Sequence, residues 1–154
     1  MYVPRRKASL GTGHDPTSPS LDTDMKAVAG GAGGPELAGI RVLVAEDEAV
    51  IALDLGETLR SLGCVVCTTT ASGAEVLDLV RQERPDVVLL DLGLVDGFAG
   101  PLATTLRTEG VPFVLMTGYP QELLDDPALR DAPVLRKPYM REELTHVLAQ
   151  VVGR

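Results

Sequence analysis

Residues 85 to 91 have the sequence Pro-Asp-Val-Val-Leu-Leu-Asp, an apolar run that ends in a carboxylate. Continuous runs of Val and Leu are typical of strands in parallel sheets, because helices cover both faces of such sheets. Ligands of these sheets bind outside the carboxyl ends of the strands. We therefore expect a central buried strand that places Asp91 at the functional edge of the sheet.

Three further apolar segments also end in polar side chains. Because the carboxyl ends of parallel strands meet at one edge of the sheet, we expect these side chains to lie close to Asp91. The segments are residues 40–47, which end in Glu46 and Asp47, residues 111–117, which end in Thr117, and residues 133–137, which end in Lys137.

Stretches of apolar residues at helical spacing separate the expected strands. Ser72 and Glu75 have the spacing of a capping box that would open one helix, and Gly63 is placed to end the helix before it. Residues 119–131 contain two prolines and predict only a short helix. The strand–helix unit repeats five times, and such units form parallel sheets with right-handed crossovers. We predict an α/β fold, a doubly wound (βα)5, flavodoxin-like three-layer sandwich with strand order 2-1-3-4-5.

The first part of the chain differs in composition from the rest. Residues 1–36 are rich in Gly, Pro, Ser and Thr and show neither helical nor strand periodicity, which is typical of a flexible tail. Their glycine cluster precedes the first strand, whereas a phosphate-binding loop follows a strand and opens a helix. We therefore expect a tail at residues 1–36 and one globular domain at residues 37–154.

The net charge of the chain is −8, and it arises from residues 37–154, which carry ten Lys or Arg and eighteen Asp or Glu. An acidic domain repels a phosphate backbone, so the composition argues against nucleic-acid binding. No apolar run approaches the roughly 20 residues that cross a bilayer, and the N-terminal residues lack the apolar stretch of a secretory signal. We expect a cytoplasmic monomer that does not contact a membrane.

Cys64 and Cys67 form a Cys-x-x-Cys pattern, which in other contexts belongs to redox or zinc sites. Here the pair lies within a segment of strand composition, where residues three apart point to opposite faces. The sequence has no second cysteine pair to complete a zinc site. We predict two ordinary reduced thiols.

The acidic side chains expected at the sheet edge need a counter-charge. Two carboxylates about 4 Å apart repel each other by roughly 4 kcal/mol at a surface-like dielectric constant, so Glu46, Asp47 and Asp91 require compensation. Oxygen ligands of this kind suit Mg²⁺, which typically takes one or two carboxylates and bridges to a phosphate oxygen. This donor set points to phosphoryl chemistry, in which Lys137 and Thr117 could hold phosphoryl oxygens and one carboxylate could act as the nucleophile.

Four short segments resemble the motifs of the response-regulator receiver domain, the CheY-like family. The resemblance covers about residues 39 to 153 and involves every polar side chain expected at the sheet edge. The segments are Val-Leu-Val-Ala-Glu-Asp-Glu at 42–48, Val-Val-Leu-Leu-Asp at 87–91, Met-Thr-Gly at 116–118 and Lys-Pro at 137–138.

This resemblance implies a role for each of these side chains. Asp91 would accept a phosphoryl group from a phosphohistidine, and Thr117 and Lys137 would contact the phosphoryl oxygens. The implied Mg²⁺ ligands are Asp47, Asp91 and the backbone carbonyl of Gly93, with Glu46 acting through a water molecule.

The sequence departs from the common receiver pattern at two places. Receivers usually carry an aromatic switch residue three positions before the lysine, where this chain has Val134, and the loop after Asp91 is two residues shorter than the common form. With Pro-Phe-Val-Leu-Met-Thr-Gly-Tyr at 112–119, these features resemble in part the single-domain receiver subgroup named after its Phe-Ala-Thr-Gly-x-Tyr motif, here with Leu-Met in place of Phe-Ala. Tyr119 is therefore our candidate for a side chain that moves on activation.

The resemblance implies a stand-alone response regulator of a two-component system or phosphorelay, which is a phosphoacceptor rather than an enzyme. Its partners would be a histidine kinase or phosphotransfer protein and a downstream protein, unless it acts as a phosphate sink. A metal-dependent phosphohydrolase is a second hypothesis, but such enzymes commonly need an acid two residues after the nucleophile, where this chain has Gly93. A third is a pseudo-receiver that only binds partners, which would be expected to have lost the acids or Lys137.

Overall fold

The computed structural model describes residues 35–94, 99–118 and 126–153, and these contain a five-stranded sheet with four α-helices and one 3₁₀ helix. Within those ranges, no helix combines the length and the hydrophobicity that crossing a membrane requires. The elements are η1 (Pro35–Leu37), β1 (Arg41–Ala45), α2 (Ala49–Ser61), β2 (Val65–Thr70), α3 (Gly73–Glu83), β3 (Val87–Asp91), α4 (Ala99–Glu109), β4 (Phe113–Thr117), β5 (Val134–Arg136) and α6 (Arg141–Val151).

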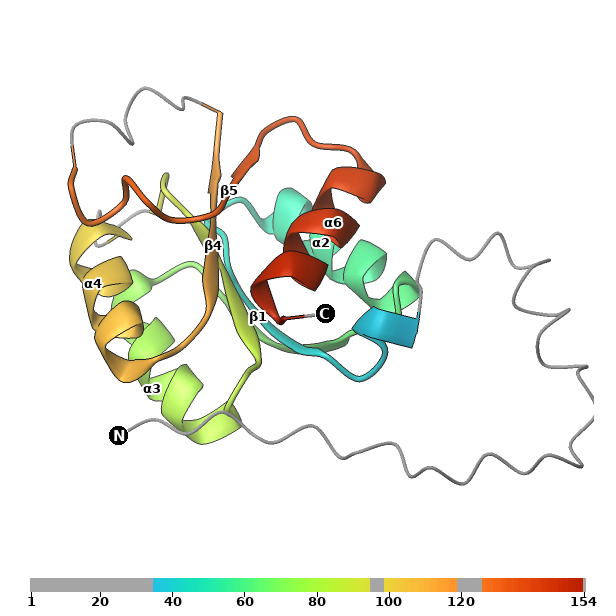
Figure 1. The fold of residues 1–154 in the computed structure, drawn as a ribbon, viewed down its shortest axis with the longest axis horizontal. Coiled ribbons are helices and arrows are strands. Elements are labelled where there is room, and N and C mark those ends of the chain that lie inside the picture. The colour runs from blue at the N-terminus through green and yellow to red at the C-terminus, as the bar shows by residue number, and fades with distance from the viewer. Residues whose placement is uncertain (1–34, 95–98, 119–125, 154) are drawn as a thin grey trace, which may run out of the picture.

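The sheet has the strand order β2-β1-β3-β4-β5, and every pair of neighbouring strands is parallel. Helices α2 and α6 cover one face of the sheet, and α3 and α4 cover the other (Figure 1). The predicted doubly wound, three-layer α/β architecture and its strand order are therefore confirmed.

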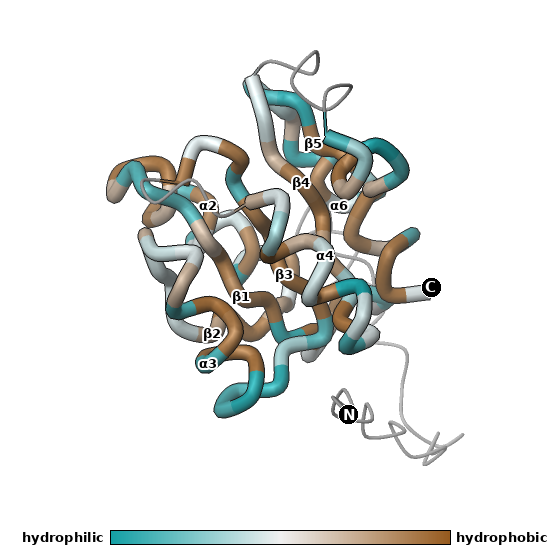
Figure 2. The backbone as a smooth tube through the Cα atoms, turned by 90° about the vertical axis from the view of Figure 1, so that its left-hand side faces the viewer, coloured by the Kyte–Doolittle hydropathy of each residue, from teal (hydrophilic) through white to brown (hydrophobic). Residues whose placement is uncertain are grey.

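The central strands are buried on both faces, as their continuous apolar sequences predict. All five residues of β3 and all five of β4 are buried. Val87 and Leu89 face the α2 and α6 side, whereas Val88 and Leu90 face the α3 and α4 side. The apolar strands accordingly run through the middle of the molecule (Figure 2). Full burial of one such Leu or Val side chain contributes about 1.5–3 kcal/mol to folding, so β3 stabilises the packing of the helices on both faces of the sheet.

Strand β2 forms one edge of the sheet and is more exposed than the central strands. Its Thr68 is bound by the carboxylate of Glu83, which accepts the Thr68 backbone N–H at 2.9 Å and its hydroxyl at 2.6 Å. The two free cysteines flank this region: Cys64 packs with the α2 and α6 layer, and Cys67 packs against the α3 and α4 layer. The prediction that they point to opposite faces is confirmed, and burial raises the pKa of the Cys64 thiol to about 11.

One local prediction was wrong. Ser72 and Glu75 do not form a capping box, because the Ser72 N–H is donated to the Thr70 hydroxyl, which itself donates to the Glu75 carboxylate at 2.6 Å. The short helix that we expected within 119–131 falls mainly on residues 119–125, which lie outside the described residues; residues 127–131 form turns. At the start of these turns, the Asp126 side chain accepts the backbone N–H of Ala128 at 2.9 Å.

The first described element begins two residues before residue 37, the domain boundary that we expected. Helix η1 starts at Pro35 and contacts α6, and Leu37 is fully buried. Gly63 ends α2 with a φ of +91°, as its position predicts, and its carbonyl accepts the Gly39 N–H at 2.9 Å. These contacts tie the start of the domain to α6 and to the end of α2. The remainder of the predicted tail lies outside the described residues.

Candidate functional site

The carboxyl ends of the central strands lie side by side because of the register between them. The last residues of β1 pair with β3 through Ala45 and Leu90, and Asp91 pairs with Met116 in β4. Thr117 then pairs with Arg136 in β5, and its carbonyl accepts the Lys137 N–H at 2.8 Å. The polar residues at the ends of these strands are thereby brought to one edge of the sheet.

Lys137 connects two of the predicted acidic residues. Its Nζ lies 2.9 Å from Oε2 of Glu46 and 3.1 Å from Oδ2 of Asp91. The Glu46 side chain is fully buried and that of Asp91 is 7% exposed, whereas Lys137 is 21% exposed. An ammonium group therefore bridges two buried carboxylates at the ends of β1 and β3.

Backbone groups hold the remaining carboxylate oxygens. Oδ1 of Asp91 accepts the N–H of Gly93 at 2.9 Å, and Oε1 of Glu46 accepts the N–H of Glu48 at 3.1 Å. The Glu46 N–H is itself donated to the carbonyl of Thr70 at 2.9 Å. Both carboxylates are consequently fixed on two sides, which gives this group of acids a defined geometry.

The environment shifts the pKa values of the two buried carboxyl groups in opposite directions. Burial, with the hydrogen bond to Asp91, raises the pKa of Glu46 from 4.5 to about 7. Burial would also raise the pKa of Asp91, but hydrogen bonds from Glu46, Gly93 and Lys137 outweigh it and lower that pKa. Burial opposes the charge on Lys137 as well, but the two carboxylates outweigh it and raise the pKa of its ammonium group. Near neutral pH, Asp91 is therefore an ionised carboxylate, whereas part of the Glu46 carboxyl groups carry a proton.

The other predicted site residues have different positions relative to this cluster. Thr117 is the last residue of β4 and is 4% exposed. Gly93 lies next to the Asp91 carboxylate, since a Cβ at this glycine would be 3.5 Å from Oδ1. Val134, in the position of the usual aromatic switch, is half-buried against the α3 and α4 layer. Tyr119 lies outside the described residues.

A second acidic group lies directly after β1. Glu46, Asp47 and Glu48 each offer a carboxylate oxygen, and these oxygens lie within 4.8 Å of one another. Such a set of hard oxygen donors fits a divalent cation such as Mg²⁺. Glu48 was not among the ligands that we expected, although it directly follows the predicted pair in the sequence.

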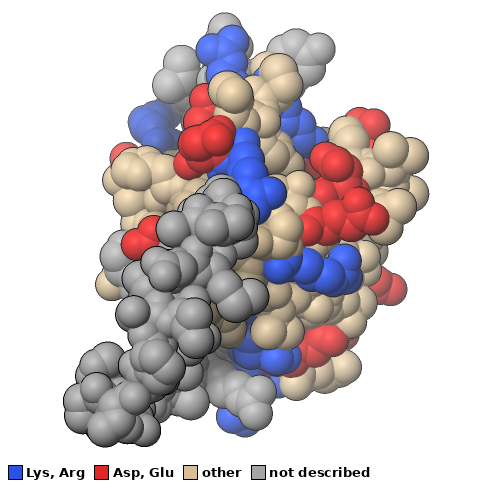
Figure 3. All heavy atoms as spheres, turned by 90° about the vertical axis from the view of Figure 1, so that its right-hand side faces the viewer, with Lys and Arg blue, Asp and Glu red and all other residues tan. Residues whose placement is uncertain are grey.

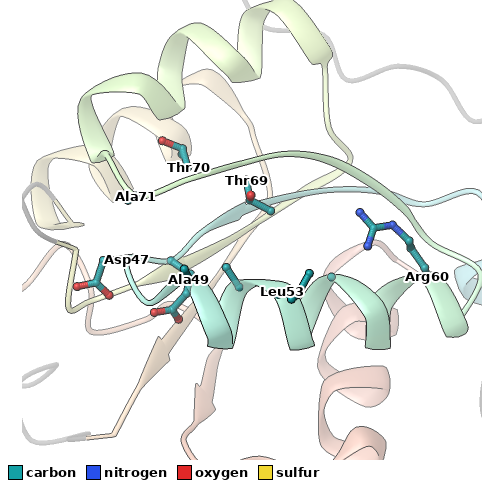
Figure 4. Close-up of a pocket in the computed structure, with 10 residues that line it drawn as sticks. Asp47, Ala49, Leu53, Arg60, Thr69, Thr70 and Ala71 are labelled. Atoms are coloured by element: carbon teal, nitrogen blue, oxygen red, sulfur yellow. The ribbon is translucent and has the colours of Figure 1, made fainter.

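A cavity of about 450 Å³ opens beside these acids, between α2 and the end of β2. Asp47 lies at one end of the cavity and Arg60 at the other, with Thr69 on the strand side and Leu53 on the helix side (Figure 4). On the molecular face in Figure 3, Lys and Arg side chains are interspersed with Asp and Glu. The part of that face formed by described residues shows no continuous basic patch.

Residues 42–149 match the family model of the response regulator receiver domain, so the chain belongs to this family. One relative is the Phyllosphere-induced regulator PhyR of Methylorubrum extorquens, which is 30% identical over 140 residues that cover 86% of this chain and 52% of PhyR. Another is the transcriptional regulatory protein PdtaR of Mycobacterium tuberculosis, which is 31% identical over 74% of this chain and 57% of PdtaR. The chain thus spans little more than half the length of these two regulators.

Solved receiver structures have the same fold. The receiver domain of PhyR from Erythrobacter litoralis is 29% identical, with a TM-score of 0.66 over 75% of this chain and 92% of that chain. SdrG from Pseudomonas melonis Fr1, solved in a BeF3-activated conformation, is 32% identical with a TM-score of 0.64 over 75% of this chain and 98% of that one. The chain is therefore a receiver domain of the kind found in two-component response regulators.

Proposed function

We propose that Asp91 accepts a phosphoryl group from the phosphohistidine of a histidine kinase or phosphotransfer protein. The arrangement that best supports this proposal is the Lys137 bridge, in which an ammonium group contacts Asp91 and Glu46 at 3.1 and 2.9 Å. The lowered pKa of Asp91 keeps its carboxylate ionised and ready to act as a nucleophile.

In the proposed reaction, an oxygen of the Asp91 carboxylate forms a bond to phosphorus as the P–N bond of the phosphohistidine breaks. The imidazole ring leaves with the electron pair of that bond, and Asp91 becomes an acyl phosphate. Lys137 would exchange its contact with the free carboxylate for one with a phosphoryl oxygen, and the Thr117 hydroxyl would contact another. Buried donors of this kind stabilise the charge that develops on the phosphoryl group.

Mg²⁺ would be held at the same edge of the sheet by Asp47 and Asp91, with the carbonyl of Gly93 and a water-mediated contact from Glu46. When bound, it would neutralise the acids and the phosphoryl oxygens. The spacing of the carboxylate oxygens of Glu46, Asp47 and Glu48 supports a divalent cation here and adds Glu48 to the nearby acids.

The proposed output of phosphorylation is a conformational change that a downstream protein recognises, or a transfer that drains phosphoryl groups from a kinase. Relatives such as PhyR and PdtaR are regulators, which supports a signalling role over metabolic catalysis. We propose a cytoplasmic protein that binds protein partners and not nucleic acid.

The proposal is tested by labelling the full chain with phosphoramidate in the presence of Mg²⁺ and measuring the mass of the product. The wild-type protein should gain one phosphoryl group, and Asp91→Asn should gain none, because an amide cannot replace the carboxylate nucleophile. Asp78→Asn is a matched control, since Asp78 is 75% exposed on α3. Wild-type labelling of Asp91→Asn would exclude Asp91 as the acceptor.

A further inference from the structure

Residues 126–132 pack against α4 on the outer layer of the sandwich (Figure 1). Leu129 is 6% exposed and belongs to the same buried cluster as the leucines of α4. Near the C-terminal end of α4, Nη1 of Arg107 donates to the carbonyl of Ala128 at 2.9 Å. The Arg107 guanidinium also lies 5.6 Å from the ring centroid of Phe113. The segment is therefore attached to α4 by both apolar and polar contacts.

A third contact lies at the start of α4. The carboxylate of Asp126 occupies the space that a side chain at Gly100 would fill, since a Cβ at this glycine would overlap Oδ2 of Asp126. Oδ1 of Asp126 accepts the Ala128 N–H at 2.9 Å, which fixes the orientation of the carboxylate. The first turn of α4 has no acidic residue of its own. Asp126 thus supplies the negative charge that a helix N-terminus favours.

This contact joins two parts of the chain that leave the phosphorylation site separately. Helix α4 follows Asp91 along the chain, whereas the segment of Asp126 lies between Thr117 and Lys137. Asp91 itself is held to β4, because it pairs with Met116 and the next residue donates its N–H to the Met116 carbonyl at 3.1 Å. The two sides of the contact between Asp126 and Gly100 are thus connected along the chain to different residues of the site.

We propose that Gly100 and Asp126 form a conformational clasp that is closed while Asp91 is unphosphorylated and opens when Asp91 carries a phosphoryl group. This inference rests on the proposed role of Asp91. The closed clasp coexists with Lys137 bound to both Glu46 and Asp91. In the proposed transition, a phosphoryl group on Asp91 draws Lys137 and Thr117 toward its oxygens, and residues 126–132, which precede β5 and Lys137 in the chain, shift relative to α4.

The clasp provides a route of communication that does not need an aromatic switch. Val134 has no ring and no hydroxyl to follow the movement of Thr117, and it is packed in the α3 and α4 layer. The segment of Asp126 instead precedes β5 and Lys137 along the chain, and its Leu129 and Arg107 contacts with α4 rearrange when the clasp opens. Opening of the clasp changes how the surface formed by α4 and residues 126–132 is presented to a partner.

Thermodynamic linkage determines how a weaker clasp changes the affinity of the protein for a phosphoryl analogue. If the closed clasp favours the unphosphorylated state, then a substitution that opens it must raise the affinity for a phosphoryl analogue by the same coupling factor. Couplings of this kind are typically about 5-fold or larger. We therefore expect clasp variants to bind beryllofluoride at about 5-fold to 10-fold lower concentration than the wild type.

Two substitutions weaken the clasp in different ways. Asp126→Asn removes the charge but keeps an oxygen for the Ala128 N–H, so the turn is retained. Gly100→Ala fills the space of the carboxylate and displaces it, although Ala is the better helix former. Asp131→Asn is the matched control, because Asp131 is exposed in the same segment. Each full-length protein is titrated with beryllofluoride and Mg²⁺, and the backbone amide resonances are followed by NMR.

We expect the amides of Ala128 and Leu129 to shift on saturation of the wild type. In both clasp variants these amides should already lie toward the saturated position before beryllofluoride is added, and half-saturation should need about 5-fold to 10-fold less of it. Half-saturation within 2-fold of the wild type in Asp126→Asn would overturn the clasp, as would unchanged Ala128 and Leu129 amides in the saturated wild type. If the wild type binds no beryllofluoride, the proposed role of Asp91 fails and the clasp loses its trigger.

Discussion

Glu46 gives the metal-free protein a pH-dependent stability whose direction follows from its environment. Burial and the neighbouring Asp91 raise its pKa from 4.5 to about 7. Between these pH values the folded protein binds a proton that the unfolded chain has released, so the free energy of unfolding falls as the pH rises. One pKa unit corresponds to about 1.36 kcal/mol, which gives a loss of about 3 kcal/mol across this window. The lowered pKa of Asp91 adds nothing there, since Asp91 is ionised in both states.

The substitution Glu46→Gln keeps the size of the side chain and removes the titration. Urea denaturation followed by circular dichroism, in a buffer with a metal chelator, would measure the free energy of unfolding at pH 5 and pH 7. The wild type should lose about 2–3 kcal/mol between these values, and Glu46→Gln should lose most of this dependence. Glu57→Gln is the matched control, because Glu57 is exposed on α2.

The outcome that would refute this reasoning is a wild-type protein that is equally stable, or more stable, at pH 7 than at pH 5. The same result would follow if the Lys137 ammonium group compensated both carboxylates fully, which would leave Glu46 ionised. A pH dependence that persists unchanged in Glu46→Gln would assign the effect to a different group.

Two further predictions concern residues at opposite ends of the central strands. Mg²⁺ at 100 times its dissociation constant should raise the free energy of unfolding of the wild type by about 2.7 kcal/mol. Calorimetry should show the corresponding rise in melting temperature, and Asp47→Ala should remove most of it. Equal rises in both proteins would argue against Asp47 as a ligand. At the opposite end of the strands, before β3, the buried Asp86 carboxylate accepts the Arg41 backbone N–H at 2.8 Å. Asp86→Ala should therefore lower the free energy of unfolding, measured by urea denaturation, by about 1–3 kcal/mol, while phosphoryl labelling of Asp91 is retained. Loss of labelling in the folded variant would contradict the expectation that Asp86 acts only on stability.

The sequence was sufficient to predict the sheet because its strands carry continuous apolar runs. The run that ends in Asp91 is buried at every position, and a parallel sheet places all carboxyl ends at one edge. That rule alone brought Lys137 together with Glu46 and Asp91, which are 91 and 46 residues away from it along the chain. It could not supply the detail that one ammonium group contacts both carboxylates, since this depends on side-chain rotamers.

Local patterns were less informative where several partners compete for one group. The Ser72 and Glu75 spacing fits a capping box, but the Thr70 hydroxyl donates to Glu75 and accepts the Ser72 N–H instead. Likewise, no spacing in the sequence connects Gly100 with Asp126, because their contact depends on how a turn segment packs on a helix. Contacts between a loop and a helix lack the periodicity that makes strands and helices predictable.

The carboxylate of Glu83 has a consequence for how this domain can associate. Edge strands expose unpaired N–H groups that can recruit a strand from another chain and so extend the sheet. At the centre of β2, both the N–H and the hydroxyl of Thr68 already donate to Glu83. A strand approaching β2 would have to displace this acid before it could pair there. The opposite edge strand, β5, has only three residues, which leaves little backbone for pairing. We therefore expect this domain to associate with other chains through its helical faces rather than by pairing of edge strands.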